Sequence, residues 1–101
     1  MSVQSTIELQ LRTLPDAPGV YQYFDKDSKI LYVGKAKNLR KRVSSYFNKQ
    51  HDTARINVLV KKIATIKHIV VETEMDALLL ENSLIKNLQP RYNILLKDDK
   101  T

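Results

Sequence analysis

The first residues of the chain show the periodicity of a short helix. Ile7, Leu11 and Leu14 recur at the spacing of one helix face, and Pro15 ends the run. Ser5 stands three residues before a glutamate, which is the pattern of a capping box at a helix N-terminus. The sequence therefore predicts an opening helix that begins near Ser5.

A strand pattern follows this helix. Residues 19–24 alternate two tyrosines with other strand-forming side chains, and an apolar run at 30–34 comes after a polar turn at 25–28. Two such runs around a short polar turn predict a β-hairpin. A register that pairs Tyr21 with Tyr32 would set two phenols side by side on one face, but the alternation does not fix the register.

The rest of the chain is predicted to be mainly helical, on the basis of cap residues, apolar periodicity and proline. In chain order the expected elements are a helix from Asn38 to about Phe47, a helix capped by Asp52 or Thr53 that includes residues 56–63, a strand at 69–71, and a helix from Met75 to Leu88. The order helix, strand, strand, helix, helix, strand, helix indicates an α/β fold. We expect a small three-stranded mixed or antiparallel sheet flanked by helices.

Composition narrows the possible chemistry. The 101 residues are expected to form a single domain, residues 1–101. The chain has no Cys and two His, which excludes thiolate chemistry and leaves oxygen as the expected ligand of any metal. The longest apolar run, Ala77 to Leu80, is far too short to span a membrane, and the N-terminus lacks a signal pattern. A soluble, cytoplasmic protein with no membrane association is expected.

Charge is distributed unevenly along the chain. Lys and Arg outnumber Asp and Glu by 17 to 11, a formal charge of +6. No acidic residue falls between Ser28 and His51, whereas that stretch contains Lys29, Lys35, Lys37, Arg40, Lys41, Arg42 and Lys49. The sign reverses from Glu72 to Glu81. A solvated surface can carry such a basic block, and the functional alternative is a polyanion partner such as nucleic acid.

Glu81 falls where an apolar side chain is expected. On a helical wheel it lies near the middle of an aliphatic arc that consists of Ala77, Leu78, Leu80, Leu84, Ile85 and Leu88. Burying a carboxylate without a partner costs free energy, so a glutamate at this position requires an explanation. Two interpretations stay open: a structural carboxylate that forms a buried salt bridge or reaches water, and a metal ligand or acid–base group.

Arg42 lies at the border of the apolar face of its helix, one turn before Tyr46. Its guanidinium could reach along the sheet, or its stem could cover apolar surface while the charge stays in water. Arg40 and Lys41 are expected to be ordinary solvent or phosphate contacts.

Two tripeptides on the predicted hairpin, Gly19-Val20-Tyr21 and Tyr32-Val33-Gly34, resemble the two halves of the GIY-YIG nuclease motif. The resemblance extends to Gly34–Leu39, Arg42, Tyr46, Leu80–Lys86, Pro90–Asn93 and Leu95–Asp99. From about Leu14 to Asp99 the chain is similar to the N-terminal nuclease domain of the UvrC family, which acts in bacterial nucleotide excision repair. Valine replaces isoleucine in both tripeptides, which is a conservative change.

This resemblance implies a GIY-YIG nuclease fold and metal-dependent hydrolysis of a DNA phosphodiester, the incision on the 3′ side of a damaged nucleotide. Glu81 would be the one protein ligand of a single Mg²⁺ or Mn²⁺. Tyr32 would be the general base that activates water, and its positive neighbours Lys35 and Arg42 are expected to lower its pKa. Arg42 would also stabilise charge in the transition state.

The resemblance assigns supporting roles to further residues. Those that orient or support the site are Tyr21, Tyr46 and Asn93, with Gly19 and Gly34 as structural positions of the motif. Those that would bind the DNA backbone without reading bases are Lys37, Arg40 and Lys41. Gly34 would let its strand end closely against the site.

The implied partners are damaged duplex DNA and, through a segment beyond these residues, UvrB. The chain is then expected to be an N-terminal fragment of a longer protein, and monomeric. Three alternatives stay open: another structure-specific or homing-type GIY-YIG nuclease, a non-catalytic nucleic-acid-binding module, and a protein-interaction domain that has lost catalysis on the same scaffold. Glu81 and Tyr32 favour an enzyme, because a binding module has no use for a carboxylate in an apolar stripe.

Overall fold

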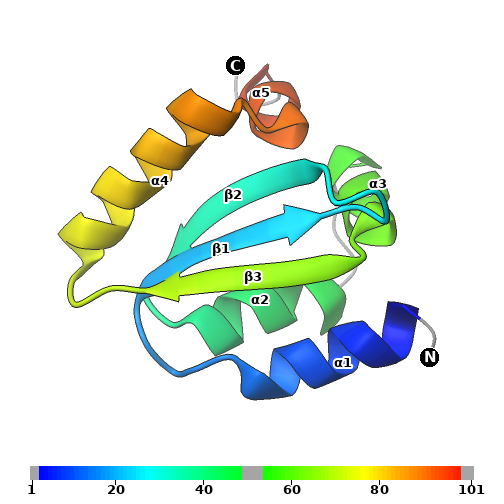
Figure 1. Cartoon of the computed structure of the whole chain (residues 1–101), viewed down its shortest axis with the longest axis horizontal. Helices are drawn as coiled ribbons and strands as arrows, with labels where there is room; N and C mark the ends of the chain where they lie inside the picture. The colour runs from blue at the N-terminus through cyan, green and yellow to red at the C-terminus, as the bar shows by residue number, and fades with distance from the viewer. Residues whose placement is uncertain (1–2, 49–53, 99–101) are drawn as a thin grey trace.

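The computed structural model describes residues 3–48 and 54–98, which form a three-stranded sheet with helices on both faces (Figure 1). In chain order the elements are α1 (Val3–Thr13), β1 (Gly19–Phe24), β2 (Ile30–Ala36), α2 (Leu39–Asn48), α3 (Ala54–Lys62), β3 (Thr65–Val70), α4 (Glu74–Leu88) and α5 (Arg91–Asp98). The predicted α/β fold is confirmed. Within the described residues, no helix combines the length and apolar character needed to cross a membrane.

The sheet is antiparallel throughout, with β1 between β2 and β3. Its register differs from the Tyr21–Tyr32 pairing considered above, because Tyr21 lies opposite Gly34 and Tyr23 lies opposite Tyr32. The hairpin turn contains Ser28 in the left-handed region at φ 64°, and the pairing shifts just after Tyr23. Leu31 is the extra residue at this bulge, so turn geometry sets the register.

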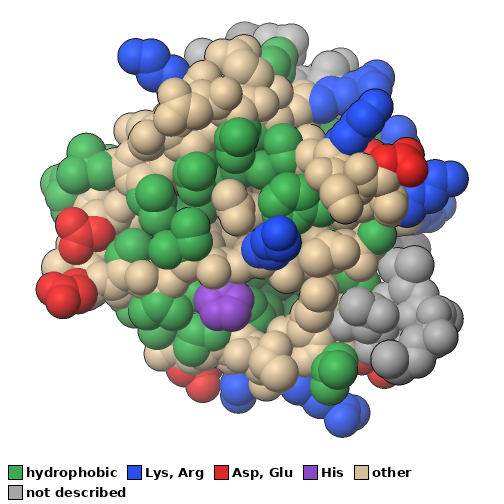
Figure 2. Space-filling view, viewed as in Figure 1, with side chains coloured by type: hydrophobic (Ala, Val, Ile, Leu, Met, Phe, Trp, Pro, Cys, Tyr) green, Lys and Arg blue, Asp and Glu red, His purple; other side chains and the backbone are tan. Residues whose placement is uncertain are grey.

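Two apolar clusters pack on opposite faces of the sheet. The main core contains the tyrosines of β1 together with buried side chains of α1, α2 and α3, among them Ile7, Leu39 and Leu59. The second cluster is smaller, and its buried members are Val20, Val33 and Ala77. Figure 1 shows α4 apart from α1 and α2, and Figure 2 shows hydrophobic side chains gathered over the face that α4 only partly covers.

Several predicted boundaries are corrected by the structure. α1 begins at Val3, so Ser5 lies inside the helix and the predicted capping box is wrong. The cap at Asn38 is confirmed, since its Oδ1 accepts the Lys41 backbone N–H at 3.0 Å. β3 begins at Thr65 rather than at residue 69. Lys49, Asp52, Thr53 and Asp99 lie outside the described residues.

α5 is a helix that the periodicity did not predict. Gln89 ends α4 in the left-handed conformation, with φ 49° and its N–H bonded to the Ile85 carbonyl. Pro90 then starts a new turn, because its carbonyl accepts the N–H groups of Asn93 and Ile94. The proline therefore separates two helices, and the second helix brings Asn93 back to the edge of the sheet.

Candidate active site

Four tyrosines form the centre of the site. Tyr21 and Tyr23 point to the same face of β1, and Tyr32 from β2 and Tyr46 from α2 complete the group, with ring centroids 5.2 to 6.4 Å apart. The hydroxyls of Tyr21 and Tyr46 share a hydrogen bond of 3.0 Å. The structure thus brings together three of the predicted tyrosines, and it adds Tyr23, whose hydroxyl is buried without a hydrogen-bond partner in the described part of the chain.

The two motif glycines provide space rather than unusual backbone angles. A Cβ placed on Gly34 would overlap the Cζ and hydroxyl of Tyr21, so this glycine makes room for the phenol beside it. A Cβ on Gly19 would overlap the backbone carbonyl of Ile69 on β3 and press on the side chain of Leu39. Gly34 is therefore needed to place Tyr21, which is more specific than the expected close strand end.

Tyr32 is half-buried, and its surroundings act on its pKa in both directions. Burial raises the pKa of this phenol above its ordinary value, Tyr46 and Glu81 raise it further, and Arg42 lowers it. The net shift is upward. Arg42 thus lowers the pKa of Tyr32 as expected, but burial outweighs Arg42.

Arg42 extends from α2 over the tyrosines. Its guanidinium carbon lies 5.3 Å from the centre of the Tyr46 ring, within the range of a cation–π contact. Burial lowers the pKa of Arg42, but the charge and hydrogen bonding of Tyr21 and the charges of Tyr46 and Tyr32 raise it by more. The structure favours the first of the two interpretations, in which the guanidinium reaches along the sheet, because it is directed to the tyrosine cluster.

Glu81 reaches the same edge of the sheet from α4. Its side chain is half-buried, and Oε2 accepts the backbone N–H of Lys35 at 3.1 Å. The wheel is right in placing Glu81 on the sheet-facing side, but wrong for Leu78 and Leu88, which are exposed because only one narrow face of α4 meets the strands. Among the described residues, no Lys or Arg forms an ion pair with Glu81.

Asn93 holds the outer edge of β2 from α5. Its Oδ1 accepts the N–H of Val33 and its Nδ2 donates to the carbonyl of Val33, both at 2.8 Å. One amide therefore makes the two bonds that a neighbouring strand would make. Val33 lies between Tyr32 and Gly34, which are both site residues. The two hydrogen bonds from Asn93 therefore hold β2 in place at the site.

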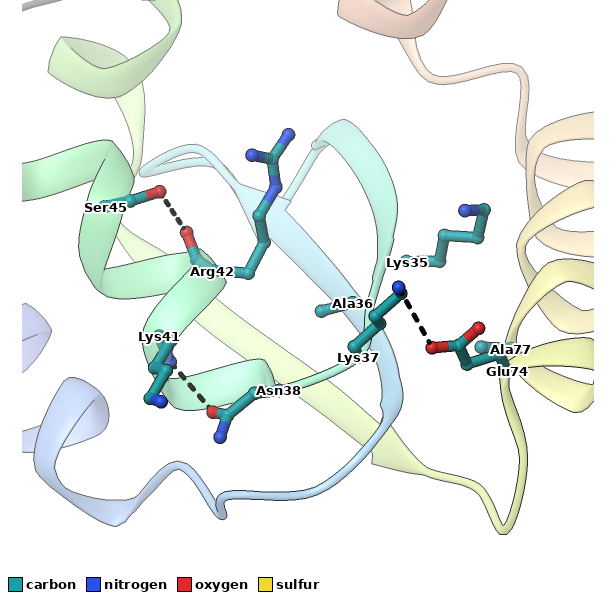
Figure 3. A pocket seen from close by; sticks show the side chains of 9 residues that line it. All are labelled: Lys35, Ala36, Lys37, Asn38, Lys41, Arg42, Ser45, Glu74 and Ala77. Atoms are coloured by element: carbon teal, nitrogen blue, oxygen red, sulfur yellow. Dashed lines mark hydrogen bonds and ion pairs between the residues drawn. The ribbon is translucent and has the colours of Figure 1, made fainter.

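A cleft of about 480 Å³ opens between α2 and α4 (Figure 3). Its lining residues are Lys35, Ala36, Lys37, Asn38, Lys41, Arg42, Ser45, Glu74 and Ala77. Lys37 and Lys41, predicted to bind DNA, both lie in it. The prediction missed Glu74, although its position seven residues before Glu81 places both carboxylates on one side of α4.

Arg40 lies away from this cleft. Its Nε donates to the Leu14 carbonyl at 2.8 Å, one terminal nitrogen donates to the Arg12 carbonyl at 3.2 Å, and the other lies 3.7 Å from an Asp16 oxygen. The guanidinium thus satisfies carbonyls at the C-terminal end of α1. Arg40 ties α2 to α1, whereas Lys37 and Lys41 line the cleft.

The donor set at the site suits a hard cation that keeps most of its water. No group of three or more His, Asp or Glu side chains that could hold a metal is present in residues 3–48 and 54–98. Mg²⁺ needs only one or two carboxylates, since water and a phosphate can supply the other oxygens. Glu81, with one oxygen held by the Lys35 backbone, fits that requirement.

Comparison with known proteins agrees with this geometry. The family model of the UvrC-like GIY-YIG domain matches residues 17–94. The UvrABC system protein C of Flavobacterium psychrophilum is 82% identical over 97 residues, which are 96% of this chain and 16% of that protein. That of Porphyromonas gingivalis is 61% identical over the whole chain and 17% of its own length. The chain therefore spans about one sixth of the length of these relatives.

A solved structure gives the same result. The chain is similar to the crystal structure of the GIY-YIG N-terminal endonuclease domain of UvrC from Thermotoga maritima bound to its catalytic divalent cation, magnesium, with a TM-score of 0.77 and 35% identity. The match covers 91% of this chain and 98% of that one. The shared fold, the matched family model and the identity to these relatives together show that the chain belongs to the family of UvrC-like GIY-YIG domains.

Proposed function

We propose that this domain is a divalent-metal-dependent endonuclease that hydrolyses a DNA phosphodiester bond. Within a longer protein it makes the incision on the 3′ side of a damaged nucleotide in nucleotide excision repair. One observation carries the proposal: Arg42 from α2 and Glu81 from α4 both lie near enough to Tyr32 on β2 for their charges to act on its phenol. The names of the relatives and the magnesium in the Thermotoga maritima domain support it.

Tyr32 has the role of general base in this mechanism. It takes a proton from the water that attacks the phosphorus. This step requires the phenolate form of Tyr32, and burial works against that form because it raises the pKa of the phenol. Arg42 favours the deprotonated phenol and binds oxygens of the scissile phosphate, where charge develops. The hydrogen bond between Tyr21 and Tyr46 keeps the neighbouring phenols in place.

Glu81 would hold the metal, Mg²⁺ or Mn²⁺, which supplies positive charge at the leaving 3′ oxygen when bound. The backbone N–H of Lys35 donates to Glu81, and Lys35 also lines the cleft. Asn93 acts as a positioning residue through Val33. Lys37 and Lys41 contact the DNA backbone, and Arg40 is left out of this set because its guanidinium is bound to α1.

The proposed partners are damaged duplex DNA and, in the longer protein, UvrB through a segment outside these residues. We propose that the domain itself acts as a monomer. A basic cleft without a base-reading motif should bind DNA weakly and with a steep dependence on salt, since phosphate contacts dominate.

The test is a nicking assay on an end-labelled duplex with one lesion, with and without UvrB bound to the DNA, in Mg²⁺, Mn²⁺ or EDTA. We expect metal-dependent cutting on the 3′ side of the lesion. Tyr32→Phe should abolish it while folding and DNA affinity survive, because only the ionisable oxygen is lost. The matched control is Tyr92→Phe, which changes a buried tyrosine outside the four-tyrosine group. Cutting by Tyr32→Phe at the wild-type rate would exclude Tyr32 as the base.

A further inference from the structure

Among the described residues that line the cleft between α2 and α4, one carboxylate stands among basic side chains. Glu74, the first residue of α4, lines it together with Lys35, Lys37, Lys41 and Arg42. Glu74 Oε1 lies 3.6 Å from Lys37 Nζ, so the ion pair joins the end of β2 to the opposite wall (Figure 3). An acidic group in a cleft that should bind a polyanion works against binding, and it therefore needs an explanation.

We propose that Glu74 competes with DNA for Lys37, so that its carboxylate holds in the free domain a place that a backbone phosphate takes in the complex. This inference rests on the proposed function, because it assumes that the cleft binds DNA. A carboxylate oxygen and a phosphate oxygen are both charged acceptors for the same ammonium group. Each phosphate that binds Lys37 must therefore first displace Glu74.

The ion pair is weak enough to be displaced. The Lys37 and Glu74 side chains are both largely exposed, and exposed pairs of this kind contribute little to stability. In the described part of the chain, Lys35 and Lys41 have no such carboxylate partner. Lys37 is therefore the cleft lysine whose availability to DNA depends on another side chain, which makes Glu74 a determinant of affinity.

Asp76 offers a matched control on the same helix turn. Both Glu74 and Asp76 are acidic residues of the first turn of α4, where negative charge is favourable to the helix dipole. Asp76 does not line the cleft, and its backbone N–H is bonded to the Thr73 cap at 3.1 Å. Asp76→Asn therefore removes the same charge and the same dipole interaction without releasing Lys37.

The experiment measures binding of a fluorescent duplex in EDTA, which prevents cutting, at several salt concentrations. The variants are Glu74→Gln, Asp76→Asn, Lys37→Ala and two double variants that combine Lys37→Ala with Glu74→Gln or with Asp76→Asn, all checked by thermal melting. We expect Glu74→Gln to bind about twofold to fivefold more tightly than Asp76→Asn at low salt, the range of one exposed ion pair. In the Lys37→Ala background this advantage should disappear, because there is no ammonium to release.

Two results would overturn the inference. Equal tightening by Glu74→Gln and Asp76→Asn would mean that only total charge matters, and an advantage that persists without Lys37 would mean that the ion pair is not the cause. A heparin column separates this failure from failure of the proposed function. If the wild type binds no duplex but Glu74→Gln elutes at higher salt than Asp76→Asn, Glu74 does compete with a polyanion for Lys37. The proposed function in DNA binding would then be wrong. Elution of Glu74→Gln and Asp76→Asn at the same salt concentration would contradict the proposed competition.

Discussion

α2 and α4 face each other across the cleft, and they are attached to the domain in different ways. Leu39 and Val43 of α2 are 0% exposed and anchor it in the main core. On α4 only Ala77 is buried, while Met75 and Leu79 are 62% and 60% exposed. The wall that carries Arg42 is positioned by apolar burial. The wall that carries Glu81 has a smaller apolar contact with the sheet, through Ala77 and the partly buried Leu80, Leu84 and Ile85.

The largest expected effect comes from removing the carboxylate of the α4 wall. Glu81→Gln and Glu81→Leu should both be inactive with any divalent metal, because the negative charge that holds the cation is gone. In EDTA, Glu81→Leu should be as stable as the wild type or more stable by about 1 kcal/mol, since no ion pair with a described residue depends on this group. Urea melts and the nicking assay measure the two properties separately.

A loss of about 3 kcal/mol in both Glu81 variants would contradict this view of α4. Such a loss is typical of breaking a buried ion pair, and it would make Glu81 a structural residue. The difference between the two walls would then no longer hold, because a site residue on each wall would also stabilise the fold.

On the α2 wall, the effect should depend on which side of the helix a cation occupies. Arg42→Ala should lower the rate of cutting at saturating DNA by about 10²-fold, the cost of one missing donor to the transition state. Lys41→Ala, the adjacent cleft residue, should change that rate little and weaken DNA binding instead. The check is single-turnover kinetics at several DNA concentrations. Equal loss of rate in both variants would show that the two cations only bind backbone.

The smallest expected effect concerns the core beneath the α2 wall. The Tyr23 hydroxyl is fully buried, and no described group forms a hydrogen bond with it. Because an unsatisfied buried hydroxyl costs about 1–3 kcal/mol, Tyr23→Phe should raise the free energy of unfolding by about 1 kcal/mol and leave cutting unchanged. Tyr21→Phe breaks the bond to Tyr46 and should lower it instead. A Tyr23→Phe protein that is less stable would mean that the hydroxyl has a bonded water.

Most of the fold could be predicted from local pattern. The tyrosine alternation in β1, the Asn38 cap and the order of the elements from α1 to α4 are local properties, and the structure confirms them. β3 was placed too late because Ile66 is the one apolar residue in its first four positions, between Thr65 and Lys67, so the apolar run begins only at Ile69. α5 was missed because Pro90 ends one helix and starts another within the same short stretch.

The site was less predictable, because its geometry depends on contacts between distant segments. Glu81 could be selected from the wheel, since a carboxylate in an apolar stripe is a local anomaly. The burial that raises the pKa of Tyr32 comes from packing that no single segment reveals. Arg40 and Lys41 look alike in sequence, and only the position of α1 shows that Arg40 is bound to its carbonyls.

The Asn93 clasp on Val33 also bears on how the domain avoids self-association. β2 is an edge strand, and the free N–H and C=O groups of an edge are a template for pairing with a strand of another molecule. Here Asn93 occupies both groups of Val33, Glu81 takes the next outward N–H at Lys35, and on the opposite edge Gln10 accepts the N–H of Ile66 at 2.8 Å. The side chains proposed to position the chemistry therefore also shield the sheet against edge-to-edge aggregation.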